Sequence, residues 1–552
     1  MTMTPELEAR GHASAVPADA GTAELDVALF LVLAGSTVLG THALLFRGGI
    51  HGVSLDEGYL AAFGLRMIDG HFLPYVDAVS HRGPLLYALS AAFQWCFGKF
   101  DWLGIRLLAC TLTLASVAGC YLVGRASGRP RAGAIAAALL AFMLCACVWY
   151  QAGLSVDGEL ASLPFALAAT ALALTALRRP LPDGRQGALL VAGCLAALAA
   201  LTKQTSAAVC FVLFLGCVAR ALELRSAGSA APWRGCVAFA VGVVTPVALL
   251  VAVYAARGQL SALGYWLFRY NSEIYLDPYR GPEAFRTAAG WWSRSQFAVV
   301  FSVGAAMGLF SLVRSFAHAK ALTLTALFRA YRQRTPEVTV ALLVVLSFAA
   351  ALSPLRMFPH YFVLLYPWLA LEFAFFLEER WVALPGWRFL RFVLALVMLA
   401  VLAGRLEILG TSVESSSLEP DGTNNVCAAL DRFSKRGDAI IVWGFDADVY
   451  LTCQRAVATK YVFSTPVLGV VPPRFGRQRD RWVVPGARAE MAAEIERVRP
   501  KVVLDNVGRF MGKGIGSVPE LRRVLGRDYC LREEVPERGR TFQLYTRKED
   551  GC

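Results

Sequence analysis

The sequence predicts a mainly α-helical, polytopic membrane protein with about eleven transmembrane helices, amphipathic juxtamembrane helices and a C-terminal extracytoplasmic α/β domain. Apolar residues make up 56% of the chain, charged residues only 17%, and the mean hydropathy is +0.50, which excludes an ordinary soluble globule. Apolar runs of about 15–22 residues recur along the chain, long enough to cross a hydrocarbon core roughly 30 Å thick. The loops between these runs alternate in basic charge.

Eleven apolar runs are candidates for membrane spans. They lie near 27–46, 103–124, 132–149, 159–177, 187–201, 205–219, 236–256, 296–313, 337–353, 361–377 and 391–409. The fifth and sixth runs are short and are separated by little more than Lys203 and Gln204. They are either two spans joined by a tight turn or one interrupted pair.

The distribution of basic residues predicts the orientation. The short loops after spans 2, 4, 6, 8 and 10 each carry at least three Lys or Arg residues, whereas the short loops on the opposite side offer only Lys203 and Arg356. The first set is therefore cytoplasmic by the positive-inside rule, and the net charge of +13 follows from topology without a nucleic acid partner. The protein is expected in an inner or plasma membrane.

Three regions follow from this topology. Residues 1–25 are polar and are expected to form a disordered cytoplasmic leader, and the first apolar run is long enough to be retained as an anchor. Residues 26–409 form the membrane domain, with a first extracytoplasmic loop at 47–102 and another outer loop at 257–295. An odd number of spans places residues 410–552 outside the cytoplasm.

The region 410–552 has the pattern of a small α/β domain. Strands are expected at 438–443, 461–463 and 501–504, helical patterns lie at 487–498 and 519–526, and the segment 541–545 closes the domain. Four cysteines lie in this region, on the oxidising side of the membrane: Cys427, Cys453, Cys530 and Cys552. One disulfide is possible, and the sequence leaves all three full pairings open.

The first outer loop carries the most informative polar residues. Asp56 and Glu57 follow the first span by about ten residues, and two carboxylates are costly beside a bilayer. Ser54 and Glu57 fit a capping box for an amphipathic helix at 55–68 that lies on the membrane surface, so helix capping is the favoured role of Glu57. Asp56 is not needed for that box, and a functional role is favoured for it.

Further charged residues are expected to converge on the same outer face. Each has a structural alternative: lipid-facing snorkelling for the basic residues, helix capping for the residues that open the fourth span, and an interfacial hydrogen bond for a lone histidine. Their convergence nevertheless favours a site, because a carboxylate can take a proton while fixed cations hold an anion. The residues concerned are Asp77, His81, Arg82, Asp157, Lys203, Arg356 and His360.

These motifs resemble the GT-C superfamily of integral-membrane glycosyltransferases, in particular the protein O-mannosyltransferases and the aminoarabinose transferase of lipid A. The acidic motif of that superfamily is matched by Leu55–Tyr59, and its second loop motif by Tyr75–Asp77 with Arg82–Leu85, where Gly83 replaces the first proline. Leu201–Lys203 resembles a Leu-x-Lys element, and His360–Tyr361 with Tyr366–Pro367 resembles a late-span motif. Trp443–Gly444, Tyr450 and Thr459–Tyr461 resemble the tails of bacterial relatives.

The resemblance implies an inverting transfer of a sugar from a polyprenyl-phosphate donor to an acceptor hydroxyl outside the cytoplasm. The acceptor would be a lipid, a glycan or a protein, and membrane lipids would surround the site. Asp56, beside Glu57, is the candidate base. Arg82, Lys203 and Arg356 would bind the donor phosphate.

Two points stay open. Some relatives bind a divalent ion, for which Asp56, Asp157 and His81 would be the ligands. The competing class is a polytopic transporter or a flippase for lipid-linked glycans, but such proteins often show repeated halves and charges at mid-depth. In this sequence the acids lie at the ends of spans. A third class, a membrane-anchored assembly protein whose tail binds the partner, leaves the first loop unexplained.

Overall fold

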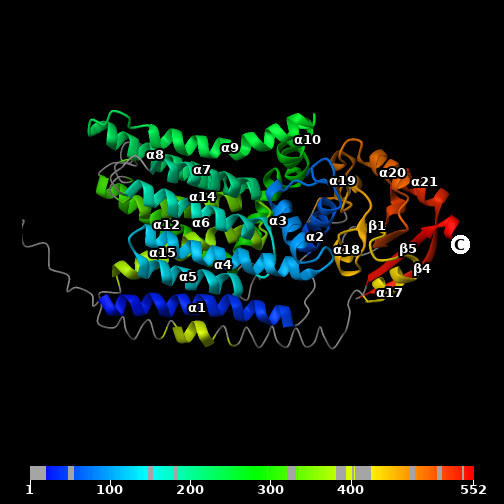
Figure 1. Ribbon diagram of the computed structural model, residues 1–552, viewed down its shortest axis with the longest axis horizontal. Helices are drawn as coiled ribbons and strands as arrows, with labels where there is room; N and C mark the ends of the chain where they lie inside the picture. The colour runs from blue at the N-terminus through cyan, green and yellow to red at the C-terminus, as the bar shows by residue number, and fades with distance from the viewer. Residues whose placement is uncertain are drawn as a thin grey trace, which may run out of the picture.

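The computed structural model describes a mainly helical, polytopic chain with a small sheet, which confirms the fold class at that level. Figure 1 shows a bundle of long helices at one end of the molecule and the sheet, near the C-terminus, at the other end. The described residues are 20–47, 55–146, 153–178, 185–294, 296–319, 328, 331, 334–380, 393, 395–400, 403, 424–471, 479–506, 513–537 and 540–551.

Ten of the eleven apolar runs are helices within the described residues, and the run at 391–409 lies mostly outside them. Seven described helices are long and apolar enough to cross a membrane unaided, so the number eleven stays a prediction. The fifth and sixth runs form two separate helices joined by a 3-10 turn at Gln204–Ser206. The bundle consists of α1 Ala20–Arg47, α4 Trp102–Ala126, α5 Pro130–Cys145, α6 Gly158–Arg178, α7 Arg185–Thr202, α8 Ala207–Ser226, α9 Arg234–Ala256, α12 Gln296–Ala319, α14 Thr335–Leu352 and α15 Tyr366–Arg380.

Small residues allow these helices to pack closely. A Cβ added to Gly193 on α7 would lie 2.2 Å from the Phe239 carbonyl oxygen on α9, and one on Gly242 would lie 2.0 Å from the Leu190 carbonyl oxygen. Backbones can approach this closely only where side chains are small, as is typical of helix interfaces in membranes.

Two shorter helices, α2 (Leu55–Ile68) and α3 (Pro84–Phe97), lie between the bundle and the sheet (Figure 1). The predicted helix at 55–68 is therefore present, but its predicted place on the membrane surface is wrong, because its residues are buried from Glu57 to Met67. One side of α2 packs on α3, and Gly58 packs on the backbone of Asp448, so that an added Cβ would lie 2.7 Å from its nitrogen.

The tail, residues 424–551, contains a five-stranded sheet of order β2-β1-β3-β5-β4. Strands β1 (Ala439–Trp443), β2 (Ala456–Val457) and β3 (Val502–Asn506) are parallel, with Ile440 opposite Val457 and Val502. Strand β5 (Arg540–Arg547) runs antiparallel to β3 and pairs with β4 (Tyr529–Glu537). The helices of the tail are α17 Asn424–Phe433, α18 Asp448–Thr452, α19 Thr465–Leu468, α20 Ala487–Val498 and α21 Pro519–Asp528.

Most of the predicted tail elements are confirmed. Strands near 438–443 and 501–504 and helices near 487–498 and 519–526 are present, and the closing segment 541–545 lies in strand β5. The strand predicted at 461–463 is wrong, because that segment is a bend, and the edge strand β2 lies just before it. Strand β4 was not predicted, because its alternation is broken by a register shift between Leu531 and Glu533.

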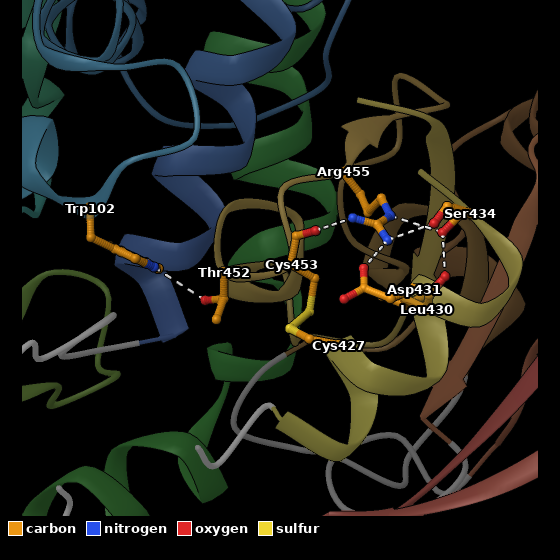
Figure 2. The surroundings of a disulfide bond; sticks show 8 residues. All are labelled: Trp102, Cys427, Leu430, Asp431, Ser434, Thr452, Cys453 and Arg455. Atoms are coloured by element: carbon orange, nitrogen blue, oxygen red, sulfur yellow. Dashed lines mark hydrogen bonds and ion pairs between the residues drawn. A yellow bond between two sulfur atoms is a disulfide. The ribbon is translucent and has the colours of Figure 1, made fainter. Parts of the chain in front are cut away.

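The tail is fixed to the end of the helix bundle where α4 begins. The Trp102 indole at the start of α4 donates to the Thr452 hydroxyl at 3.2 Å, and a disulfide joins the adjacent Cys453 to Cys427 on α17 (Figure 2). Arg455 braces the same corner by donating to Ser434. Cys530 is also disulfide-bonded. The structure therefore identifies Cys427–Cys453 as one pairing that the sequence left open.

Candidate active site

An ion pair between Asp56 and Arg82 forms the centre of the site. Asp56 lies in the first turn of α2, Arg82 lies just before α3, and an Arg82 guanidinium nitrogen is 2.5 Å from Asp56 Oδ1. The guanidinium also lies over the Tyr59 ring, 5.3 Å from its centroid. The Asp56 side chain is 43% exposed, so the carboxylate remains open to a substrate. Two residues singled out from the sequence are thus in direct contact.

This pairing controls the charge of Asp56. Partial desolvation beside the loop would raise the pKa of the carboxyl, but the Arg82 guanidinium lowers the pKa to about 2. Asp56 is therefore a carboxylate at ordinary pH, but a weak base while Arg82 holds it. Any ligand that draws Arg82 away would raise the pKa of Asp56 and make it a stronger base.

Gly83 brings Arg82 to this position. An added Cβ at Gly83 would lie 2.1 Å from the Leu201 carbonyl oxygen and 2.5 Å from that of Thr202, so the loop lies directly on the end of α7. The Gln204 side-chain amide donates to the His81 carbonyl at 3.1 Å and fixes the same contact. The first-loop motif and the Leu-x-Lys segment, far apart in sequence, are therefore adjacent in space.

Lys203, at this junction, forms an ion pair with Glu159. The Nζ to Oε1 distance is 2.6 Å, Glu159 is 2% exposed and the Lys203 side chain is 18% exposed. The ammonium group also lies 4.8 Å from the centroid of the Tyr361 ring. Glu159 was not among the predicted site residues, although it lies in the polar stretch that opens the fourth span.

Asp157, two residues before Glu159, has the role of a helix cap. Its Oδ1 accepts a hydrogen bond from the Leu160 nitrogen at 2.7 Å, at the start of α6. Burial, with the nearby Glu159 carboxylate, raises the pKa of Asp157 well above its usual range. The capping alternative considered for this residue is therefore confirmed.

Aromatic residues of the loop at 257–295, called the second outer loop after its predicted side of the membrane, hold Arg356 and His81. The Arg356 guanidinium lies 3.5 Å from the ring centroid of Tyr275 and 4.6 Å from that of Tyr279. The His81 ring is 4.0 Å from Tyr275. Burial and the cations Arg82, Arg356 and Lys203 lower the pKa of His81 well below its usual range, so the imidazole is neutral. Tyr275 was missed, and its only signal is the aromatic stretch at 275–279.

His360 lies close to the same cluster. Its ring stacks on Phe358, with centroids 5.4 Å apart, and meets Tyr361 edge-on at 4.7 Å. The Tyr361 hydroxyl is 3.3 Å from that of Tyr275, which links the loop before α15 to the second outer loop.

Glu57 and Asp77 have structural partners away from this cluster. Glu57 is fully buried, pairs with Arg106 on α4 and accepts a hydrogen bond from the Val156 nitrogen at 3.0 Å. Asp77 accepts from the Leu73 nitrogen at 2.9 Å and so closes the turn at 73–77. The proposed capping residue Ser54 lies outside the described residues.

The described residues do not favour a metal site. No group of three or more His, Cys, Asp or Glu side chains within them is close enough to hold a metal ion. Of the three candidate ligands, Asp56 is paired with Arg82, Asp157 caps α6, and His81 lies among cations. The environment therefore fits an anion better than a metal cation.

A cavity of about 250 Å³, here called the lysine cavity, opens beside Lys203. Its polar part is formed by eight residues: Glu159, Lys203, Gln204, Thr205, Asn271, Tyr275, Ser353 and Tyr361. The rest of its lining is mainly apolar and comes from the second outer loop, the end of α14 and the segment before α15: Leu267, Phe268, Leu276, Ala350, Ala351, Pro354 and Leu364. A ligand with a charged head and an apolar chain matches this division.

Comparison with known proteins supports the resemblance found in the sequence. Residues 81–249 match the family described as dolichyl-phosphate-mannose-protein mannosyltransferase. None of the curated proteins matches the chain. The matched residues include His81, Arg82, Asp157, Glu159 and Lys203, but not Asp56.

Two solved structures match most of this chain at low sequence identity. ArnT from Cupriavidus metallidurans, bound to undecaprenyl phosphate, has 14% identity and a TM-score of 0.45, with 96% of this chain and 98% of that chain covered. The oligosaccharyltransferase AglB from Archaeoglobus fulgidus, in complex with an inhibitory peptide and a dolichol-phosphate, has 14% identity and a TM-score of 0.44, with 87% and 69% covered. The family match over residues 81–249 confirms that this chain resembles the GT-C integral-membrane glycosyltransferases.

Proposed function

We propose that this protein transfers a sugar from a polyprenyl-phosphate donor to an acceptor hydroxyl on the extracytoplasmic side of the membrane, with inversion at the sugar. The observation that carries the proposal is the Asp56–Arg82 pair, on a loop that packs against the end of α7 next to Lys203, which itself lines the lysine cavity. A base, phosphate-binding cations and a groove for an apolar chain are the parts that this reaction needs.

The donor phosphate would bind between Arg82, Lys203 and Arg356. Arg82 and Lys203 are each paired with a carboxylate, and Arg356 is held by aromatic rings, so the three cations can be kept close together before a ligand arrives. An arriving phosphate competes with Asp56 for Arg82 through charge-assisted hydrogen bonds. The family name, with its dolichyl-phosphate donor, supports a carrier of this class.

The proton of the acceptor would pass to Asp56. As the phosphate takes over Arg82, the pKa of Asp56 rises from about 2 toward its ordinary value, and the carboxylate becomes a better base. The acceptor oxygen then forms a bond to the anomeric carbon while the bond from that carbon to the phosphate oxygen breaks. The polyprenyl phosphate leaves with the bonding electrons, and cations stabilise its charge.

Glu57 would act as a positioning residue in this scheme. Its buried pair with Arg106 ties the first turn of α2 to α4, and thereby holds the neighbouring Asp56 in place. The transporter alternative is less well supported, because Asp56, Arg82 and Lys203 lie at helix ends. Charges that line a transport path are typically found at bilayer mid-depth.

Binding of undecaprenyl phosphate without a sugar tests the donor site. Arg82→Ala and Lys203→Ala should each weaken binding, and the double variant should bind more weakly than either single variant. Arg82→Lys should bind between the parent and Arg82→Ala, because it keeps the charge but loses the bidentate fork. Lys99→Ala is the matched control, since Lys99 pairs with Asp69 outside the site. Parent-like binding by the double variant would refute the phosphate site.

The proposed orientation has its own test. A reporter that is active only outside the cytoplasm should work when fused after residue 430 and should fail when fused near Arg185. The opposite result would reverse the topology and place Asp56 on the cytoplasmic side.

A further inference from the structure

A second cavity, here called the tail cavity, lies where the first outer loop, the second outer loop and the tail meet. Its volume is about 700 Å³. Tyr75 and Val79 form one wall, the segment from Gln259 to Arg269 forms the second, and Lys460, Tyr461 and Glu490 of the tail form the third. The second wall consists of α10 (Leu260–Gly264) and a π-helical turn, Tyr265–Arg269, near the tail in Figure 1. Asp56 does not line it.

The charges of the tail cavity are already compensated. Lys460 pairs with Glu490 at 2.6 Å, and Arg269 pairs with Glu273 at 2.9 Å. A phosphate or a carboxylate ligand would therefore have to break an existing ion pair. A neutral ligand can instead use these groups as hydrogen-bond donors and acceptors without separating charges.

The remaining lining combines hydroxyl-binding groups with aromatic rings. Gln259 and Ser261 offer an amide and a hydroxyl, and Trp266 and Tyr461 contribute aromatic surface. The hydroxyl of Tyr265 is buried and has no hydrogen-bond partner among the described residues. Buried polar groups are normally paired, so this hydroxyl marks a place where a ligand supplies the partner. Sugars present both ring hydroxyls and apolar C–H faces, which matches this lining.

We propose that the tail cavity binds a neutral saccharide portion of the acceptor, distant from the hydroxyl that reacts. This inference rests on the proposed function and names the class of acceptor, a glycan or glycolipid. The cavity wall is joined to the reaction centre, because the Tyr75 hydroxyl donates to the Arg82 carbonyl at 2.5 Å and the Tyr59 hydroxyl donates to the Val79 carbonyl at 2.9 Å. An acceptor bound in the tail cavity is thus held at a fixed position relative to the segment that carries Arg82.

Saturation-transfer NMR with neutral monosaccharides and disaccharides tests the proposal. The protein should be held in nanodiscs, since detergents with sugar head groups would compete for the cavity. At least one sugar of the panel should give a saturable signal, and Tyr265→Phe should weaken its binding about tenfold, the loss of one hydrogen bond. Gln259→Ala should weaken binding as well. Gln543→Ala, on β5, is the matched control and should bind like the parent.

The outcomes separate this inference from the proposed function. Binding of undecaprenyl phosphate without binding of any sugar would overturn the saccharide site and leave the donor site intact. If the parent binds a sugar that the two cavity variants no longer bind, but does not bind undecaprenyl phosphate, the saccharide site would be supported and the donor site refuted. If an unstructured Ser/Thr-rich peptide gave a saturable NMR signal and no sugar of the panel did, the saccharide assignment would be wrong and a protein acceptor would be favoured.

Discussion

Replacement of Gly83 by alanine should separate the two segments that form the reaction centre. The added Cβ would lie 2.1 Å from the Leu201 carbonyl oxygen, whereas real Cβ contacts are essentially never under 3.0 Å, so the loop and the end of α7 must move apart by about 1 Å. The neighbouring carbonyl of Thr202, at 2.5 Å, blocks a sideways escape. Arg82 and Lys203 therefore shift relative to each other.

The expected loss is mainly one of function. A misplacement of about 1 Å in a catalytic constellation can cost roughly 10²-fold in rate, while overpacking typically costs about 1–3 kcal/mol of stability. Sugar transfer and undecaprenyl phosphate binding should be measured beside thermal unfolding, to separate the two effects. Gly187→Ala on α7 is the matched control, because nothing lies within 4 Å of its added Cβ. Parent-like transfer by Gly83→Ala would refute the reasoning.

Four further outcomes are expected. Asp56→Asn should lower turnover roughly 10²–10⁴-fold with folding intact, and near-parental transfer would exclude it as the base. Because the pKa of Asp56 is about 2 in the free protein, its protonation should not limit kcat/KM above a pH of about 4. The acid limb of the kcat profile should lie at higher pH, because phosphate then occupies Arg82 and the pKa of Asp56 rises. Acid limbs at the same pH in both profiles would contradict this. Glu57→Gln should cost about 3 kcal/mol in unfolding experiments, because Arg106 stays buried without its charged partner. Cys427→Ser should lower tail stability by about 2–4 kcal/mol, and reductant should lower the parent's melting temperature at least as much as this substitution does, because it also reduces the disulfide of Cys530.

The helices and most strands could be predicted because their signals are local. Apolar runs of membrane length and short buried strands such as Ala439–Trp443 depend on neighbouring residues alone. The environment of α2 could not be predicted this way. Its pattern fits a helix on a membrane surface, and only the tail, about 390 residues later, covers its outer face through the contact of Gly58 with Asp448.

In the candidate site, too, some features could be predicted from local sequence and others depend on long-range contacts. The type and approximate location of Asp56, Arg82 and Lys203 followed from charge in outer loops, and the structure places Arg82 in contact with Asp56. The partners that compensate these charges are less visible in sequence: Glu159 resembles a residue of a helix start, and Tyr275 resembles any loop aromatic. Long-range pairs of this kind need the folded geometry, because nothing in the local pattern specifies them.

Release of free undecaprenyl phosphate from a sugar-loaded undecaprenyl-phosphate carrier tests the central claim most directly. Purified protein in nanodiscs, given the loaded carrier and a saccharide acceptor, should release the free lipid phosphate in step with formation of a glycosylated acceptor. Asp56→Asn should bind the carrier but release it roughly 10²–10⁴-fold more slowly. Movement of intact carrier across the membrane, with no release of lipid phosphate by the parent protein, would contradict the account and favour a flippase.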